Sequence, residues 1–307
     1  MLHRIVSIGE CMIELSGKSD DGWRQGFAGD TFNTLWYLRA LSSPETSTDY
    51  VSAFGDDPFS RQQIEFLDRN RIGIAESPII EGKTPGLYAI TLDAAGERSF
   101  TYWRNDAAAR MLADDPKRLT QSLSGASLIY FSGITLAILA DAARETLLSA
   151  ISDARDENAS IAFDPNYRPR LWPRPEAART AIRQGYWTAS IVLPTFDDER
   201  ALFGDKTPGE TLERIIAEGP GEIVVKSGGE AALVYHGGEG VEVAPPESVE
   251  PIDTTGAGDS FNGAYLAGRL AGMTAEAAAL YAHKIAGKVI RHHGALLPMK
   301  SLAILRP

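Results

Sequence analysis

Residues 253–264 read DTTGAGDSFNGA and are the most informative stretch of the chain. Apolar or small residues recur from Phe261 at i, i+3, i+4 and i+7, which predicts that a loop here enters an amphipathic helix. Gly256 and Gly258 allow a tight turn that brings consecutive backbone N–H groups toward an anion at the helix N-terminus. Asp259 then stands in the first turn, beside the same anion.

A carboxylate beside an anion site is electrostatically unfavourable, so its presence there suggests that it has a function. One interpretation makes Asp259 the base that accepts a proton from an attacking hydroxyl, while the amides of Gly256, Ala257 and Gly258 stabilise a phosphoryl group in transfer. The alternative is that Asp259 only begins a helix, where the dipole favours a carboxylate. Neither G-x-x-x-x-G-K-[ST] nor G-x-G-x-x-G occurs, so the usual nucleotide and dinucleotide motifs are absent from the sequence.

The rest of the chain alternates between strand-sized apolar runs and longer stretches with helical periodicity. The runs are residues 6–8, 128–131, 160–163, 191–193 and 223–225, and the helical stretches are 142–155, 176–186, 197–203 and 211–217. This order predicts an α/β fold with a mostly parallel sheet flanked by helices on both faces. In such a sheet a ligand binds beyond the carboxyl ends of the strands.

Two regions, residues 12–28 and 86–104, have strand composition without a following helix. In the second, residues 87–92 and 98–103 flank a loop of hairpin size at 93–97. We expect one domain over residues 1–307, with these two regions forming a small β-sheet lid that excludes water from the site. An exposed edge of that lid can pair with a second copy of the chain, which would give a homo-oligomer.

The composition is that of a globular protein, because 44% of the 307 residues are hydrophobic and 23% are charged. It excludes a disordered chain, a collagen-like fibre and a disulfide scaffold. The formal net charge of -11 disfavours nucleic acid and anionic membrane as partners. An anionic ligand therefore needs positive charge gathered at a local site.

The N-terminal sequence indicates a cytoplasmic protein. Residues 1–15 lack the features of a signal peptide, and no stretch approaches the roughly 18 apolar residues of a membrane span. Cys11, the single cysteine, lies in an apolar run and is expected to be a buried core residue rather than a reactive thiol. The pair His292-His293 lacks other metal-ligand spacing, so no metal held by the protein alone is expected.

Residues 253–259 resemble the C-terminal signature of the ribokinase-like (PfkB) carbohydrate kinases. The resemblance covers essentially the whole chain, because further motifs match in order at residues 8–15, 29–34, 85–88, 101–105 and 163–172. Within the family, these motifs are most similar to those of kinases of a sugar acid, 2-dehydro-3-deoxygluconate. The resemblance implies an α/β domain with a β-sheet lid.

The reaction that the resemblance implies is in-line transfer of the ATP γ-phosphoryl to the 6-hydroxyl of the sugar acid, with Mg²⁺ bridging the phosphates. Asp259 is then the base, and residues 256–258 form the anion hole for the phosphoryl group. Asp253 stands where many relatives bind a monovalent cation near this loop.

A sugar acid presents hydroxyls, which call for Asp, Asn and backbone amides, and a carboxylate, which calls for the planar fork of Arg. By resemblance the substrate residues are Gly29, Asp30, Asn33, Tyr88, Tyr102, Arg104 and Arg168, together with Asp259. Gly29 would permit close backbone approach, and a helix cap at Asp30 or Thr31 is an alternative that can hold alongside.

The predicted secondary structure gives each arginine a separate position. Strand alternation puts Tyr102 and Arg104 on the same face of one predicted strand. Arg168 follows the strand-sized run at 160–163 and is expected at a carboxyl end, where the ligand lies. Arg170 is left open between a supporting role and plain surface.

For the nucleotide, the resemblance implies two sets of residues. Asn166, Lys226, Ser227 and Gly228 match positions near the phosphates or ribose, and Ala282, His283 and Ala286 lie on the helix that borders the adenine. Many relatives carry Asn-x-x-Glu after the fourth main strand, whereas the chain has Thr195-x-x-Asp198 followed by Glu199. The roles of Asp198 and Glu199 therefore stay open.

Two other functions fit part of the pattern. A kinase of a neutral sugar, such as fructose or ribose, would use the same fold and need no carboxylate partner. A non-catalytic sensor of sugar acids would use the same pocket, but it would have no need of the base in the Gly-Ala-Gly-Asp loop at 256–259.

Overall fold

The computed structural model describes residues 3–18, 22–92 and 98–307 and is built on one large sheet. Its strand order is β14-β13-β12-β11-β10-β9-β1-β4. The strands from β4 to β12 pair in parallel, whereas β13 and β14 are antiparallel, so the prediction of a mostly parallel sheet is confirmed. The strands are β1 (Arg4–Ile8), β4 (Ser47–Val51), β9 (Leu128–Ser132), β10 (Ser160–Asp164), β11 (Ile191–Val192), β12 (Glu222–Val225), β13 (Ala232–His236) and β14 (Glu239–Val243).

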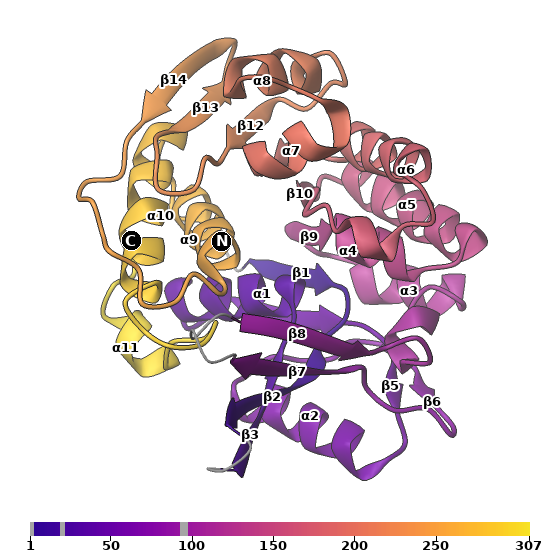
Figure 1. Ribbon diagram of the computed structural model, residues 1–307. Helices are drawn as coiled ribbons and strands as arrows, with labels where there is room; N and C mark the ends of the chain where they lie inside the picture. Colours follow the sequence, from indigo (N-terminus) through magenta and orange to yellow (C-terminus); the bar gives the residue numbers. More distant parts are fainter. Residues whose placement is uncertain (1–2, 19–21, 93–97) are drawn as a thin grey trace.

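Helices cover both faces of this sheet (Figure 1). Val6 and Ile8 of β1 belong to one buried cluster and Ile5 to the other, as period-two alternation requires of a strand buried on both faces. The helices are α1 (Asp30–Leu41), α2 (Pro58–Arg69), α3 (Pro116–Leu123), α4 (Gly133–Ile138), α5 (Asp141–Asp156), α6 (Pro175–Thr188), α7 (Phe196–Phe203), α8 (Pro208–Ile216), α9 (Ala257–Leu270), α10 (Ala275–Val289) and α11 (Met299–Ala303). The cluster with Val6 packs against α3 to α8, and the cluster with Ile5 against α1, α2, α9, α10 and α11.

A second sheet, called the small sheet below, has the strand order β3-β2-β7-β8 and lies at the foot of the view in Figure 1. Its strands are β2 (Met12–Lys18), β3 (Gly22–Ala28), β7 (Leu87–Leu92) and β8 (Arg98–Trp103). The predicted strands at 87–92 and 98–103 are confirmed, and the predicted hairpin loop at 93–97 lies outside the described residues.

The two faces of the small sheet differ. Phe27 of β3 contacts Phe66 of α2, with ring centroids 5.2 Å apart, so α2 packs against this face. By alternation, Glu14, Tyr88 and Tyr102, which lie opposite one another in the strand register, occupy the other face. The short strands β5 (Phe54–Gly55) and β6 (Ile79–Ile80) form a third, two-stranded sheet.

No helix in the described part of the chain combines the length and the apolar character that crossing a bilayer needs. Cys11 is buried as predicted, and burial raises the pKa of its thiol to about 12, which keeps it protonated at neutral pH.

Close packing of α1 on α9 sets the geometry of the molecule. A Cβ added at Gly263 of α9 would lie 2.6 Å from the carbonyl oxygen of Thr34 and 2.6 Å from Cβ of Tyr37, both on α1. Glycine is therefore required at this contact, because any larger residue would separate the helices.

We predict that Gly263→Ala lowers the free energy of unfolding by about 1–3 kcal/mol, the usual cost of overpacking a core. The matched control is Gly287→Ala on α10, where the new Cβ would be 3.5 Å from Val249, an ordinary contact. The control should be neutral or more stable, since alanine is the better helix former. Urea unfolding of both variants measures the difference, and equal stability of the two would show that the α1–α9 contact is loose.

Candidate active site

Charged and amide side chains meet where the central strands end. Asp164 ends β10 and Lys226 directly follows β12, so both lie at the carboxyl edge of the large sheet. Asp30, the first residue of α1, accepts a hydrogen bond from Asn166 at 2.9 Å. The structure thus brings Asp30, Asn166 and Lys226 to the edge where a ligand was predicted.

Asp259 has the surroundings of a general base. It lies in the first turn of α9 and accepts a hydrogen bond from Asn33 of α1 at 2.8 Å. Burial, followed by the charge of Asp30, raises the pKa of Asp259 to about 7, whereas the hydrogen bond from Asn33 lowers it. A carboxyl with this pKa is partly deprotonated at neutral pH and can accept a proton from a hydroxyl.

The N-terminus of α9 is arranged to face an anion. Its N-cap is Gly256, whose φ of 74° is in the left-handed region and which provides no side-chain hydrogen bond to the helix. The first amides of a helix have no acceptor within it, so that of Gly258 can serve a bound anion. The N–H of Ala257 donates to the carbonyl oxygen of Thr254 at 3.2 Å.

A lysine stands next to these amides. Lys226 Nζ lies 3.0 Å from Asp164 and 2.8 Å from Asn262, and Asn262 also donates to Asp164 at 2.6 Å. A Cβ added at Gly258 would lie 3.9 Å from the Lys226 nitrogen, so the ammonium is adjacent to the start of α9. The ammonium of Lys226 therefore lies at the anion-facing helix end, with its charge partly offset by the carboxylate of Asp164.

The start of α1 differs in part from the prediction. Gly29 is the N-cap and no side chain caps the helix, so the alternative of a cap at Asp30 or Thr31 is wrong. Gly29 does permit a close approach, but of the protein backbone, because a Cβ there would collide with the carbonyl oxygen of Glu10. Burial raises the pKa of Asp30, against hydrogen bonds from Ser132 and Asn166.

Tyr88 and Tyr102 form a stacked pair on the small sheet, with ring centroids 5.7 Å apart. The Tyr88 hydroxyl donates to Glu14 on the neighbouring strand. Tyr102 is 47% exposed, so a ligand can reach it.

The two predicted arginines have different environments. β8 ends at Trp103, so Arg104 stands one residue beyond the strand, and its buried guanidinium donates to the carboxylate of Glu10. Arg168 follows β10 as predicted, and its side chain is 52% exposed. Its Nη1 lies 3.4 Å from Asp198, which makes a loose ion pair that a ligand can replace.

The predicted nucleotide residues are only partly accessible. Ser227 and Gly228 follow β12, and Ser227 Oγ is a buried hydroxyl with no hydrogen-bond partner among the described residues. On α10, Nε2 of His283 lies 3.0 Å from the carbonyl oxygen of Val243, while Ala286 is partly exposed. Ala282 is fully buried in the core and offers no surface to a ligand in this structure.

Three further carboxylates have assignable surroundings. Asp253 accepts from the N–H groups of Thr255 at 2.9 Å and Gly294 at 2.6 Å, and so braces the glycine loop. Glu199 is fully buried, where burial raises its pKa to about 7 and Arg214 donates to it at 2.6 Å. Glu199 therefore anchors α7, whereas Asp198 beside it faces Arg168.

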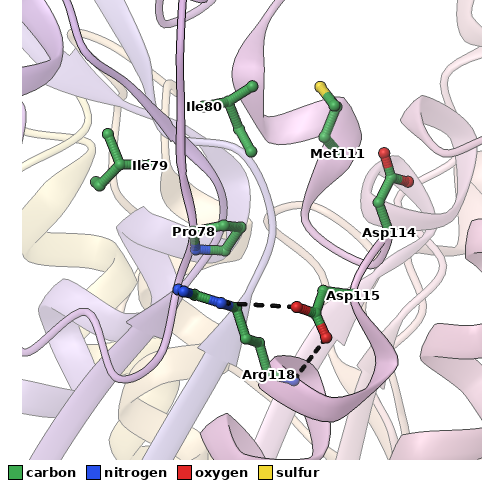
Figure 2. Close-up of a pocket in the computed structure, with 7 residues that line it drawn as sticks. All are labelled: Pro78, Ile79, Ile80, Met111, Asp114, Asp115 and Arg118. Carbon is green, nitrogen blue, oxygen red and sulfur yellow. Dashed lines mark hydrogen bonds and ion pairs between the residues drawn. The ribbon is translucent and has the colours of Figure 1, made fainter.

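A pocket of about 470 Å³ lies elsewhere, beside β6 and the start of α3, and contains none of the predicted site residues (Figure 2). Its cation, Arg118, is 3.6 Å from Asp115, which also caps α3. The charges of Arg118 and Asp115 therefore stabilise the N-terminus of α3. Within the described ranges, no group of three or more His, Cys, Asp or Glu is placed to hold a metal, and this includes His292 and His293.

Sequence reasoning missed four residues at the site: Glu10, Glu14, Asp164 and Asn262. Asn262 stands three residues after Asp259 in the same helix, a spacing that shares a face, and Asp164 ends a predicted strand. The sequence therefore contained a local signal for Asn262 and for Asp164. Glu10 and Glu14 have partners on other strands, and no local pattern indicates them.

The chain is similar to known carbohydrate kinases. The profile of the pfkB family of carbohydrate kinases matches residues 2–302. The 2-dehydro-3-deoxygluconokinase of Escherichia coli (strain K12) is 40% identical over 308 residues, which cover 98% of the chain and 99% of that protein.

Crystal structures show the same fold. The 2-dehydro-3-deoxygluconokinase of Thermotoga maritima has a TM-score of 0.82 at 19% identity, with 99% of each chain covered. An E. coli protein assigned as a ribokinase II and solved with ATP and Mg²⁺ has a TM-score of 0.82 at 24% identity, again with 99% of each chain covered.

We predict that the carboxyl of Asp259 titrates near pH 7 and that Asn33→Ala moves its pKa higher, because the hydrogen bond from Asn33 stabilises the charged form. Titration of carboxyl ¹³C signals in protein labelled at aspartate measures both values, with Asp259→Asn to assign the signal. An Asp259 pKa near 4, as in a solvated aspartate, would contradict the prediction.

Proposed function

The chain belongs to the pfkB family of carbohydrate kinases, and from this premise we propose that it phosphorylates the 6-hydroxyl of 2-dehydro-3-deoxygluconate (KDG) with ATP. The products are 2-dehydro-3-deoxy-6-phosphogluconate and ADP. The observation that carries the proposal is Asp259, a carboxyl with a pKa of about 7 at the N-terminus of α9. The 40% identity to a kinase named for KDG supports the choice of substrate.

Asp259 acts as the base in this reaction. Its deprotonated carboxylate accepts the proton of the 6-hydroxyl as the hydroxyl oxygen attacks the γ-phosphorus. Because the deprotonated form is the active one, the rate should rise as the pH rises through about 7. Asn33 keeps the carboxylate oriented toward the sugar.

The phosphoryl group lies at the start of α9. The amides of residues 256–258 and the ammonium of Lys226 stabilise the charge on the transferred group. Ser227 and Gly228, with Asn166 nearby, contribute to the phosphates or ribose, and the free hydroxyl of Ser227 fits that role. Ala286 and His283 border the adenine, with Ala282 behind them in the core.

Mg²⁺ would arrive with ATP and would neutralise charge on the phosphates. Asp164 lies 3.0 Å from Lys226, and the charge of Lys226 also acts on the carboxyl of Asp198. These two carboxylates are the side chains that would help to hold the ion. A monovalent cation near Asp253 has less support, because both oxygens of this carboxylate accept backbone N–H groups.

The sugar acid lies between α1 and the small sheet. Asp30 and Asn33 bind hydroxyls, and Gly29 lets the backbone of α1 begin close to Glu10. Tyr88 and Tyr102 cover the sugar from the small sheet, which acts as the lid. Arg104 and Arg168 bind the carboxylate, which explains how a chain with a net charge of -11 binds two anions.

Wild-type protein should release ADP from Mg-ATP with KDG, and Asp259→Asn should lower turnover by about 10²-fold or more, the range for a lost general base. Coupled ADP release with KDG, fructose, ribose and gluconate is the measurement, and Asp259→Asn is the blank. Faster turnover of fructose or ribose would favour a neutral-sugar kinase. Saturable KDG binding without ADP release would favour the sensor.

Arg168→Ala should raise the KM for KDG about tenfold or more, the scale of one charge-assisted hydrogen bond, and leave the KM for ATP unchanged. Arg170→Ala is the matched control, because Arg170 is an exposed arginine only two residues away. Equal KM values for KDG in the two variants would remove Arg168 from carboxylate binding.

We also infer a homo-oligomer formed through the small sheet, and a cytoplasmic reaction because ATP is the donor. Trp23 and Trp103 are exposed on the face of the small sheet that carries Phe27, and Phe100 is exposed on the opposite face, so large side chains are available for contact with a second copy. Light scattering after gel filtration should give a multiple of 33.2 kDa. A mass of one chain at micromolar concentration would contradict the inference.

A further inference from the structure

The chain enters or leaves the small sheet four times, and these four passages meet at one joint. They are residues 9–11 between β1 and β2, Gly29 between β3 and α1, residues 84–86 before β7, and residues 104–107 after β8. The N–H of Ile13 donates to the carbonyl of Gly86 at 2.8 Å, which joins the first passage to the third.

Two glycines make the joint compact. A Cβ at Gly29 would collide with the carbonyl oxygen of Glu10, and a Cβ at Gly86 would collide with the Glu10 side-chain carboxylate. The same Cβ at Gly86 would be 3.1 Å from Cβ of Arg104. Glu10 therefore touches the other three passages.

At this joint the carboxylate of Glu10 accepts a hydrogen bond from Nη2 of Arg104. The side chains are 1% and 8% exposed, so the ion pair is desolvated. Within the described residues, Oε1 of Glu10 and Nε of Arg104 are buried without hydrogen-bond partners. Burial raises the pKa of Glu10, and Arg104 is the main group that opposes it.

Such a pair is a poor way to stabilise a fold, because replacing a buried ion pair with apolar side chains is often neutral or stabilising. What the pair does provide is orientation. Nη2 is committed to Glu10, which leaves Nη1 as the terminal nitrogen for a ligand. Arg104 is thereby fixed, whereas Arg168 is half exposed and only loosely paired with Asp198.

We propose that Glu10 is a positioning residue, which holds the guanidinium of Arg104 at the joint between the sheets in the orientation that receives the carboxylate of the sugar acid. The inference rests on the proposed function, because it needs KDG as the ligand. A preorganised guanidinium loses less conformational freedom when the ligand binds. Because Arg104 follows β8 of the small sheet and Glu10 follows β1 of the large sheet, the carboxylate of the bound acid would be held where the two sheets meet.

The test is calorimetric titration of the full chain with KDG alone, for wild type, Glu10→Gln and Arg104→Ala. Glu10→Gln keeps the shape of the side chain but loses the charge, and it should weaken KDG binding about tenfold while leaving the KM for ATP unchanged. In the Arg104→Ala background the same substitution should add no further loss, because Glu10 acts through Arg104. Should Glu10→Gln fail to fold, Glu10→Asp is the second variant. It keeps the negative charge but moves the carboxylate away from Arg104, because aspartate is one methylene shorter, and it should weaken KDG binding in the same way.

Glu199→Gln is the matched control, because Glu199 is also a fully buried glutamate paired with an arginine but lies on α7. It should lower stability and leave KDG affinity unchanged. Unchanged or tighter KDG binding by Glu10→Gln, or equal losses for KDG and ATP, would overturn the positioning role. If wild type does not bind KDG at all, the proposed function itself fails, and the inference fails with it.

Discussion

The close contact of α1 with α9 is the constraint on which the rest of the site depends. Gly263 lets the backbones approach until Thr34 and Tyr37 touch α9, and one turn earlier this brings Asn33 within 2.8 Å of Asp259. Both helices begin at the edge where the parallel strands end, so their N-terminal amides and first-turn carboxylates share one site. A wider separation would leave Asp259 without its partner and admit water between the helices.

Within that site, the side chains that hydrogen-bond to each aspartate influence whether its carboxyl is protonated. Asp30 and Asp259 are each held by an amide side chain, from Asn166 and Asn33, whereas Asp164 holds the ammonium of Lys226. An arginine or lysine directly on Asp259 would lower its pKa and make it a weak base. The hydrogen bond from the neutral amide of Asn33 also lowers the pKa of Asp259, but burial outweighs it, so the pKa stays at about 7.

At the small sheet, by contrast, the functional side chain has a partner of opposite charge. There Arg104 has a carboxylate partner, which holds its orientation but also offsets its charge. Arg168 is half exposed at the end of β10, and its pairing with Asp198 is loose. Under the proposed function, the fixed Arg104 and the adaptable Arg168 would together receive the carboxylate of the substrate.

The sequence by itself determined the elements and pointed to side chains that meet at the edge of the large sheet, among them Asp30, Asn33 and Asp259. The alternation of apolar runs and helical stretches predicted β9, β10, α5 and α6, because hydrophobic periodicity is local, and the glycine loop predicted the start of α9. Tertiary structure alone decided the partners: the Asn33–Asp259 bond spans 226 positions, and the Glu10–Arg104 bond spans 94. The pKa of Asp259 and the orientation of Arg104 depend on burial and on those distant groups, which no local pattern in the sequence encodes.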